Sequence, residues 1–122
     1  MNRLTPFALA VLALALTVGA PARAAETAKV FKFYCAQCHG LTGKGDGPNV
    51  TKDFPVSPRN FTSAKEMDKL SDADLRNVIL DGGPAVDKSP MMPPWGKTLT
   101  KEEVDGLIKH LRGLCKCKGK QG

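Results

Sequence analysis

The sequence is poor in features that several protein classes require. Its 122 residues contain no sustained alternation of apolar and polar side chains, so no β-sheet is predicted. There is one tyrosine and one tryptophan, and the 18 lysines and arginines are scattered, which argues against binding to nucleic acid. No long hydrophobic run occurs after residue 24, so we expect no transmembrane segment in the remainder of the chain.

The first 24 residues have the features of an export signal. Arg3 precedes an apolar run over 7–20, and Ala22-Arg23-Ala24 has the small-x-small pattern that signal peptidase recognises. The run has 14 residues, whereas crossing a bilayer takes about 20. We therefore expect residues 1–24 to be a cleaved signal and 25–122 to form one periplasmic domain. An uncleaved anchor and a buried helix are the alternatives.

Export has consequences for charge and for the thiols. Loss of Arg3 and Arg23 lowers the net charge from +6 to +4, a mild positive balance that suggests partners with acidic faces. The periplasm is oxidising, so four cysteines without another role would tend to form disulfides.

Three segments have the spacing of amphipathic helices. The first covers residues 27–39 and is stopped by Gly40. The second begins with a capping box formed by Ser71 and Asp74, and the third begins with one formed by Thr100 and Glu103. The predicted buried residues are Val30, Phe31, Tyr34 and Cys38 in the first, Leu75, Val78 and Ile79 in the second, and Val104, Leu107, Ile108, Leu111 and Leu114 in the third.

The segments between these helices are irregular. Glycine and proline interrupt residues 40–62 and the stretch "PAVDKSPMMPPWGK" too often for regular structure, although a short helical turn is expected near 63–67. The charged tail "CKCKGKQG" is expected to fray. The prediction is a small all-α domain, and because three short helices enclose little core, a large apolar cofactor would complete it.

The motif "CAQCH" indicates what that cofactor is. On a helix, Cys35, Cys38 and His39 project from one face, and C-x-x-C-H is the attachment signal for c-type haem. A thioredoxin-like redox pair would require a βαβ unit, which the sequence does not offer. A structural zinc site formed with Cys115 and Cys117 is geometrically possible if the first and last helices touch.

A sixth iron ligand has four candidates. His110 lies beside the apolar stripe of the last helix and is interpreted as a packing residue, and Met67 lies among charged residues. Met91 and Met92 stand on a loop stiffened by proline, where Pro93 keeps the preceding residue extended. Methionine is a soft ligand, and Met/His ligation raises the haem potential, so this loop is favoured.

Nearly all of the chain after the signal resembles the class I cytochromes c of bacterial periplasms. The motifs that carry the resemblance are "CAQCHG", "GKGDGPN", "PRNF", "MPPW" and the closing amphipathic helix. The resemblance implies one haem c with His39 as proximal and Met92 as distal iron ligand. It also implies that the first and last helices cross at right angles, and that the Pro48 carbonyl binds the free ring nitrogen of His39.

Two further side chains are candidates for the haem propionates. Arg59 offers a fixed cation and Trp95 an indole N–H. Both have an alternative interpretation, as surface charge and as core filler.

The sequence departs from the family pattern at three places. Met91 directly precedes Met92, and His110 stands where relatives often have an aromatic residue. The pair Cys115 and Cys117 fits no part of the pattern. It would form a local disulfide, link to another chain or remain a labile pair.

Two strong protein ligands leave no vacant position on the iron, which favours electron transfer over catalysis. We therefore expect a monomeric electron carrier of a respiratory chain, with Lys44, Lys52 and Lys97 steering it toward acidic partners. The alternatives are an electron-entry subunit of a larger enzyme, and a haem sensor or enzyme with a displaceable distal methionine.

Overall fold

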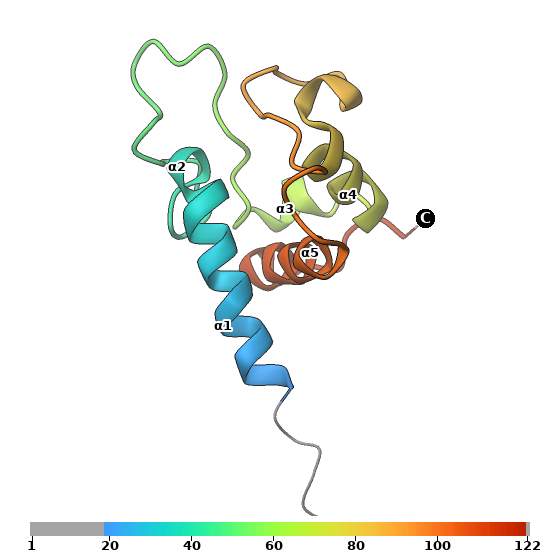
Figure 1. Cartoon of the computed structure of the whole chain (residues 1–122). Helices are drawn as coiled ribbons and strands as arrows, with labels where there is room; N and C mark the ends of the chain where they lie inside the picture. Colours follow the sequence, from blue (N-terminus) through green and yellow to red (C-terminus); the bar gives the residue numbers. More distant parts are fainter. Residues whose placement is uncertain (1–18, 122) are drawn as a thin grey trace, which may run out of the picture.

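The computed structural model describes residues 19–121, and within this range every regular element is a helix (Figure 1). The all-α prediction is therefore confirmed. Most of the predicted export signal, residues 1–18, lies outside the described residues. Between residues 19 and 121 no helix is long and apolar enough to cross a membrane.

The described part of the chain begins with a continuous helical run of three parts: α1 (Ala20–Val30), a π-helical turn (Phe31–Cys35) and α2 (Ala36–His39). It starts earlier than the predicted residue 27, because the segment that precedes this position is rich in alanine and has Pro21 in the first turn, where proline suits a helix. It ends at Gly40, as expected, where φ is +77°.

The π-helical turn was not predicted. The backbone N–H of Ala36 bonds to the carbonyl of Phe31, five residues earlier, so the turn that ends at Cys35 contains one extra residue. Such insertions are frequent at functional sites. Side-chain periodicity over so few residues does not distinguish this wide turn from an α-helical one.

The remaining helices agree with their sequence signals. α4 (Asp72–Asp81) and α5 (Lys101–Cys115) each begin with the predicted capping box, and α3 (Ala64–Met67) is the expected short turn. A 3₁₀ turn over Gly83–Val86, which was expected to be loop, extends the structure beyond α4.

The core forms where α5 packs against α1, α3 and α4. Figure 1 shows α5 running crosswise to α1. The two helices come so close that a Cβ added at Gly106 would lie 2.5 Å from Thr27 Oγ1, and the rings of Phe31 and His110 lie 4.7 Å apart. His110 therefore packs in the helix crossing, as interpreted from the sequence.

Most of the predicted core is buried, with small differences. Four predicted core residues are only half-buried, namely Tyr34, Cys38, Val78 and Leu114. Five residues outside the predicted set are buried in addition, namely Ala36, Phe61, Met67, Leu99 and Cys115. The buried apolar residues are Val30, Phe31, Ala36, Phe61, Met67, Leu75, Ile79, Leu99, Val104, Leu107, Ile108, Leu111 and Cys115.

The expectation that the C-terminal tail frays was wrong. The backbone N–H of Gly119 donates to Asp68 Oδ1 at 3.0 Å, and that of Lys120 donates to the Leu70 carbonyl at 3.1 Å. Cys115 and Cys117 form a disulfide with each other. The tail therefore lies against the turn between α3 and α4, in spite of its charged and glycine-containing composition.

The position of His110 in the helix crossing predicts that the stability of the folded protein depends on pH. His110 Nε2 is buried and has no hydrogen-bond partner among the described residues, and burial lowers the pKa of His110 below its ordinary value of 6.5. The unfolded chain therefore binds this proton more readily than the folded one. The stability that neutral His110 contributes is present above pH 6.5 and is lost as the pH falls through the lowered pKa.

We expect His110→Phe to make unfolding less sensitive to acid. The measurement is the fall in melting temperature of the haem-loaded protein between about pH 7.5 and about pH 5, a range that brackets the histidine titration. The fall should be smaller in the variant than in the parent. The other histidine, His39, is the same in both proteins, and equal falls would contradict the expectation.

Candidate haem-binding site

Cys35, Cys38 and His39 lie together at the end of the first helical run, and each is half-buried. Both cysteines are free thiols, and the described residues contain no strand, so the βαβ unit of a thioredoxin-like redox pair is absent from residues 19–121. Burial raises the pKa of the Cys35 thiol to about 11, so this thiol is protonated at neutral pH. Two reduced thiols and an imidazole at C-x-x-C-H spacing fit the attachment of haem c.

The glycine-rich segment after His39 folds back onto the end of α2. The N–H of Gly47 donates to the Cys38 carbonyl at 3.1 Å, and that of Asn49 donates to the Gln37 carbonyl at 2.9 Å. These carbonyls at the helix end would otherwise lack partners. Gly47 passes so close to the helix end that a Cβ on it would overlap the Gln37 carbonyl oxygen, so the backbone requires glycine there.

His39 is held by the "PRNF" segment. Its Nδ1 lies 3.3 Å from the carbonyl oxygen of Arg59, and its ring stacks on Phe61 with centroids 4.4 Å apart. Because a carbonyl only accepts, Nδ1 carries the proton and Nε2 keeps a free lone pair. Burial lowers the pKa of His39, an effect that the Arg59 carbonyl partly opposes, so the ring is suited to the neutral state in which imidazole binds metals.

The expected partner of this nitrogen, the Pro48 carbonyl, is therefore replaced by that of Arg59. The reason lies in how the loop closes: the N–H of Phe61 donates to the Gly43 carbonyl at 2.7 Å, which draws the "PRNF" backbone up to the histidine. Pro48 is exposed, between two residues that cap the helix end. The sequence identified "PRNF" as a motif but did not reveal that a backbone carbonyl and an aromatic ring are what it contributes.

The structure distinguishes the two methionines of the second loop. Met92 is half-buried and packs against the core, whereas Met91 is 46% exposed. Met92 is therefore the residue whose side chain is directed inward, in agreement with the preference for it as distal ligand.

Backbone hydrogen bonds fix the loop that carries Met92 to the C-terminal end of α4. The N–H of Gly83 donates to the Met92 carbonyl at 3.0 Å, and that of Trp95 donates to the Ile79 carbonyl at 2.9 Å. Gly82 has a φ of +81°, and a Cβ on it would lie 2.9 Å from the Met92 carbonyl oxygen. Glycine is therefore needed at 82 both for the backbone angle and for the close approach.

An aromatic contact brings the two candidate segments together. The rings of Tyr34 and Trp95 lie 5.1 Å apart at an interplanar angle of 60°. Tyr34 directly precedes Cys35, and Trp95 follows Met92 by three residues. The contact places the loop that carries Met92 beside the segment that contains Cys35, Cys38 and His39. This role of Tyr34 was not predicted, because the apolar spacing assigned the residue to the helix core alone.

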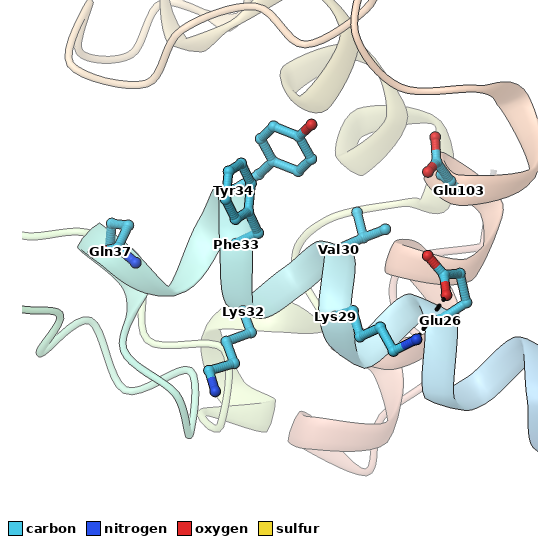
Figure 2. A pocket seen from close by; sticks show the side chains of 8 residues that line it. All are labelled: Glu26, Lys29, Val30, Lys32, Phe33, Tyr34, Gln37 and Glu103. Carbon is cyan, nitrogen blue, oxygen red and sulfur yellow. Dashed lines mark hydrogen bonds and ion pairs between the residues drawn. The ribbon is translucent and has the colours of Figure 1, made fainter.

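Exposed apolar side chains occur beside both candidate segments. Phe33 is 72% and Leu41 69% exposed, on either side of Cys35–His39, and Met91 is exposed next to Met92. Figure 2 shows Phe33 and Tyr34 on the same stretch of helix, at a surface hollow that Gln37 also lines. A large apolar cofactor bound to the thiols would have such side chains to contact, which is a second observation that fits haem.

The other polar candidates lie at the surface. The Arg59 guanidinium forms an ion pair with Glu66, with Nη1 and Oε2 3.6 Å apart. Lys44, Lys52 and Lys97 are all exposed. No cluster of three or more histidine, cysteine or carboxylate side chains that would hold a metal is found within residues 19–121, and the zinc alternative is excluded because Cys115 and Cys117 are joined to each other.

The fold and the site together define a class I c-type cytochrome. The chain belongs to the family described as "Cytochrome C oxidase, cbb3-type, subunit III", which matches residues 22–111. It is also similar to cytochrome c-553 of Helicobacter pylori (strain ATCC 700392 / 26695), with 23% identity over 104 residues that cover 85% of this chain and 95% of the relative.

Two solved structures have the same fold. The KustC0563 c-type cytochrome is 30% identical with a TM-score of 0.56, and the match covers 72% of this chain and 95% of that one. A chain of the Kuenenia stuttgartiensis reducing HAO-like protein complex Kustc0457/Kustc0458 is 27% identical with a TM-score of 0.60. That match covers 77% of this chain but only 44% of the other, which is therefore much longer.

The close approach of Gly82 to the loop that carries Met92 predicts that alanine is tolerated less well at position 82 than at position 113. Gly82→Ala should destabilise the protein by about 1–3 kcal/mol, because alanine is strained at this φ and meets the Met92 carbonyl. Gly113→Ala is the matched control, since an added Cβ meets nothing within 4 Å on α5, and it should stabilise by up to about 1 kcal/mol. Denaturant unfolding of both variants measures the difference, and equal stabilities would show that the loop is not held as described.

Proposed function

We propose that this protein carries one haem c, attached through thioethers to Cys35 and Cys38, and that it transfers single electrons in the periplasm. Bound haem supplies the one-electron Fe(II)/Fe(III) chemistry. The observation that supports the proposal is the contact between Tyr34 and Trp95, since it joins the segment with the thiols and His39 to the "MMPPW" loop, in which Met92 packs against the core.

His39 is proposed as the proximal ligand through Nε2. The hydrogen bond that Nδ1 donates to the Arg59 carbonyl keeps the proton on Nδ1, leaves the lone pair of Nε2 free and makes the imidazole a stronger metal ligand. The stacked ring of Phe61 fixes the orientation of His39 and covers one of its faces. These contacts would hold the ligand in one orientation before and after each electron transfer, which would keep structural rearrangement small.

Met92 is proposed as the distal ligand through its thioether sulfur. Thioether sulfur is a soft donor that favours the ferrous state, so the His39/Met92 pair predicts a moderate to high reduction potential. If His39 and Met92 both held the iron, no position on it would remain for a substrate, which would favour an electron carrier over an enzyme.

The surface groups are proposed to have supporting roles. Trp95, the last residue of the "MMPPW" loop, offers its indole N–H to a haem propionate, and the Arg59 guanidinium offers a positive charge to the propionates. Pro48 is proposed to border the cofactor from the segment that caps α2. Lys44, Lys52 and Lys97 would guide acidic faces of redox partners to a monomeric protein.

A second candidate function is that of an electron-entry subunit. It is favoured by the similarity to a chain of the reducing HAO-like complex of Kuenenia stuttgartiensis, which is a multi-protein assembly by its name. A protein that purifies with a stable partner after mild extraction would favour the subunit, whereas a protein that purifies alone would favour the free carrier.

The ligand assignment predicts different outcomes for the two methionines. Met92→Ala should abolish the weak iron–sulfur absorption band at the red end of the oxidised spectrum, because the sulfur donor is removed. Met91→Ala is the matched control, and it should keep the band, because Met91 is directed away from the core. The measurement is a visible spectrum of each oxidised protein.

The opposite pattern would show that Met91 is the ligand. Reduced parent protein that binds carbon monoxide readily at neutral pH would contradict the closed site altogether. That result would favour a haem sensor or enzyme with a displaceable methionine.

A further inference from the structure

The second cysteine pair lies outside the proposed haem site, at the C-terminal end of α5. Cys115 is the last residue of the helix and is buried, while Cys117 is half-buried, and their sulfurs are bonded to each other. The stabilisation that a disulfide gives grows with the length of chain it closes. This one encloses a single residue, Lys116, so it contributes little as a brace of the fold.

The enclosed residue has an unfavourable backbone conformation. Lys116 has a φ of +52° and ψ of 40°, the left-handed region in which helices usually place glycine after their last turn. The N–H groups of Lys116 and Cys117 both point to the Arg112 carbonyl. The disulfide therefore holds a lysine in a conformation that it adopts less readily when the two sulfurs are separate.

A fixed cation lies beside the more exposed sulfur. Arg112 Nη1 is 3.8 Å from Cys117 Sγ, and the guanidinium is held by the carbonyls of Met67 and Leu70 and by Asp72, at 2.7–2.9 Å. The Arg112 side chain is only 12% exposed. A positive charge in this position stabilises a cysteine thiolate and makes it a better leaving group.

We propose that Cys115–Cys117 is an exchangeable disulfide, a second redox site that takes two electrons from a dithiol such as that of an exported thiol–disulfide oxidoreductase. The three observations together support this: the bond closes almost no chain, holds an unfavourable backbone, and breaks to a thiolate that Arg112 stabilises. Exchange at this site does not involve the haem.

The exchange proceeds in two steps. A donor thiolate attacks Cys117 Sγ, the more accessible sulfur, so a donor–Cys117 bond forms, the Cys115–Cys117 bond breaks, and Cys115 leaves as a thiolate that takes up a proton. The second donor thiolate then attacks the first donor sulfur, which releases Cys117 as a thiolate beside Arg112. The donor dithiol is oxidised by two electrons to a disulfide, and the cysteine pair is reduced by two.

Reduction should loosen the tail. The docking of Gly119 on Asp68 and of Lys120 on the Leu70 carbonyl follows directly after the disulfide-bonded turn. When Lys116 is free to leave the left-handed conformation, these bonds lose the geometry that aligns them. The ratio of thiols to disulfides in the compartment would therefore determine whether the tail that follows α5 stays docked on the turn between α3 and α4.

The test uses the haem-loaded protein in glutathione buffers of graded ratio, followed by counting of thiols with a maleimide that adds mass. No thiol should be labelled before reduction and two after it, with an unchanged haem spectrum, because glutathione reduces labile disulfides and spares structural ones. Amide hydrogen exchange at Gly119 and Lys120 should become faster on reduction. Two thiols before reduction and four after it would support the exchangeable disulfide and contradict attachment of haem to Cys35 and Cys38.

Two variants test the physical causes. Arg112→Gln should make the pair harder to reduce by roughly fivefold in the exchange equilibrium, whereas Lys109→Gln, which removes an exposed charge from the same helix, should change it less than about twofold. Lys116→Gly should also make reduction harder, by roughly fivefold, because glycine accepts the left-handed conformation.

Three results would overturn the proposal. Resistance of the disulfide to every glutathione ratio until the protein is unfolded would show that it is a structural bond. Labelling of both thiols without reduction would show that the bond does not form. A dimer that only reducing agents separate would show that the cysteines join two chains.

Discussion

The candidate site depends on one arrangement that occurs twice, in which a helix ends at a glycine and the chain folds back to bind the last carbonyls of that helix. α2 ends at Gly40 and α4 at Gly82, with φ values of +77° and +81°. In each case the returning backbone donates N–H groups to carbonyls of the last turn. His39 and Met92, 53 residues apart, are thus both positioned by backbone bonds rather than by flexible side chains.

This arrangement suits electron transfer because it holds the proposed ligands in one geometry. The Tyr34–Trp95 contact joins the segment that contains His39 to the loop that contains Met92. The crossing of the first helical run with α5, where Phe31 packs on His110, lies next to this segment in the sequence. A protein built in this way would change little between its oxidised and reduced states. The disulfide between Cys115 and Cys117 is a separate feature at the C-terminal end of α5. Its proposed exchange changes the docking of the C-terminal tail and does not involve the iron.

The sequence predicted the helices because these depend on local signals, namely capping boxes and apolar periodicity. The C-x-x-C-H spacing predicted the segment that attaches haem, while the ligand pair His39 and Met92 stays a prediction that rests also on the proline-stiffened loop and on the family resemblance. It did not predict which carbonyl meets His39, because both Pro48 and Arg59 lie in irregular segments whose paths are set by long-range hydrogen bonds such as that between Phe61 and Gly43. The π-helical turn and the docked tail were missed for the same reason, since each results from tertiary packing rather than from local composition.

The most direct test of the account is the mass of the exported protein under denaturing conditions, together with its visible spectrum. Covalent attachment to Cys35 and Cys38 predicts that the polypeptide keeps the mass of one haem, and that its reduced spectrum is that of a c-type haem. A polypeptide that loses its haem in acidified organic solvent, or one that never carries haem, would contradict the central claim.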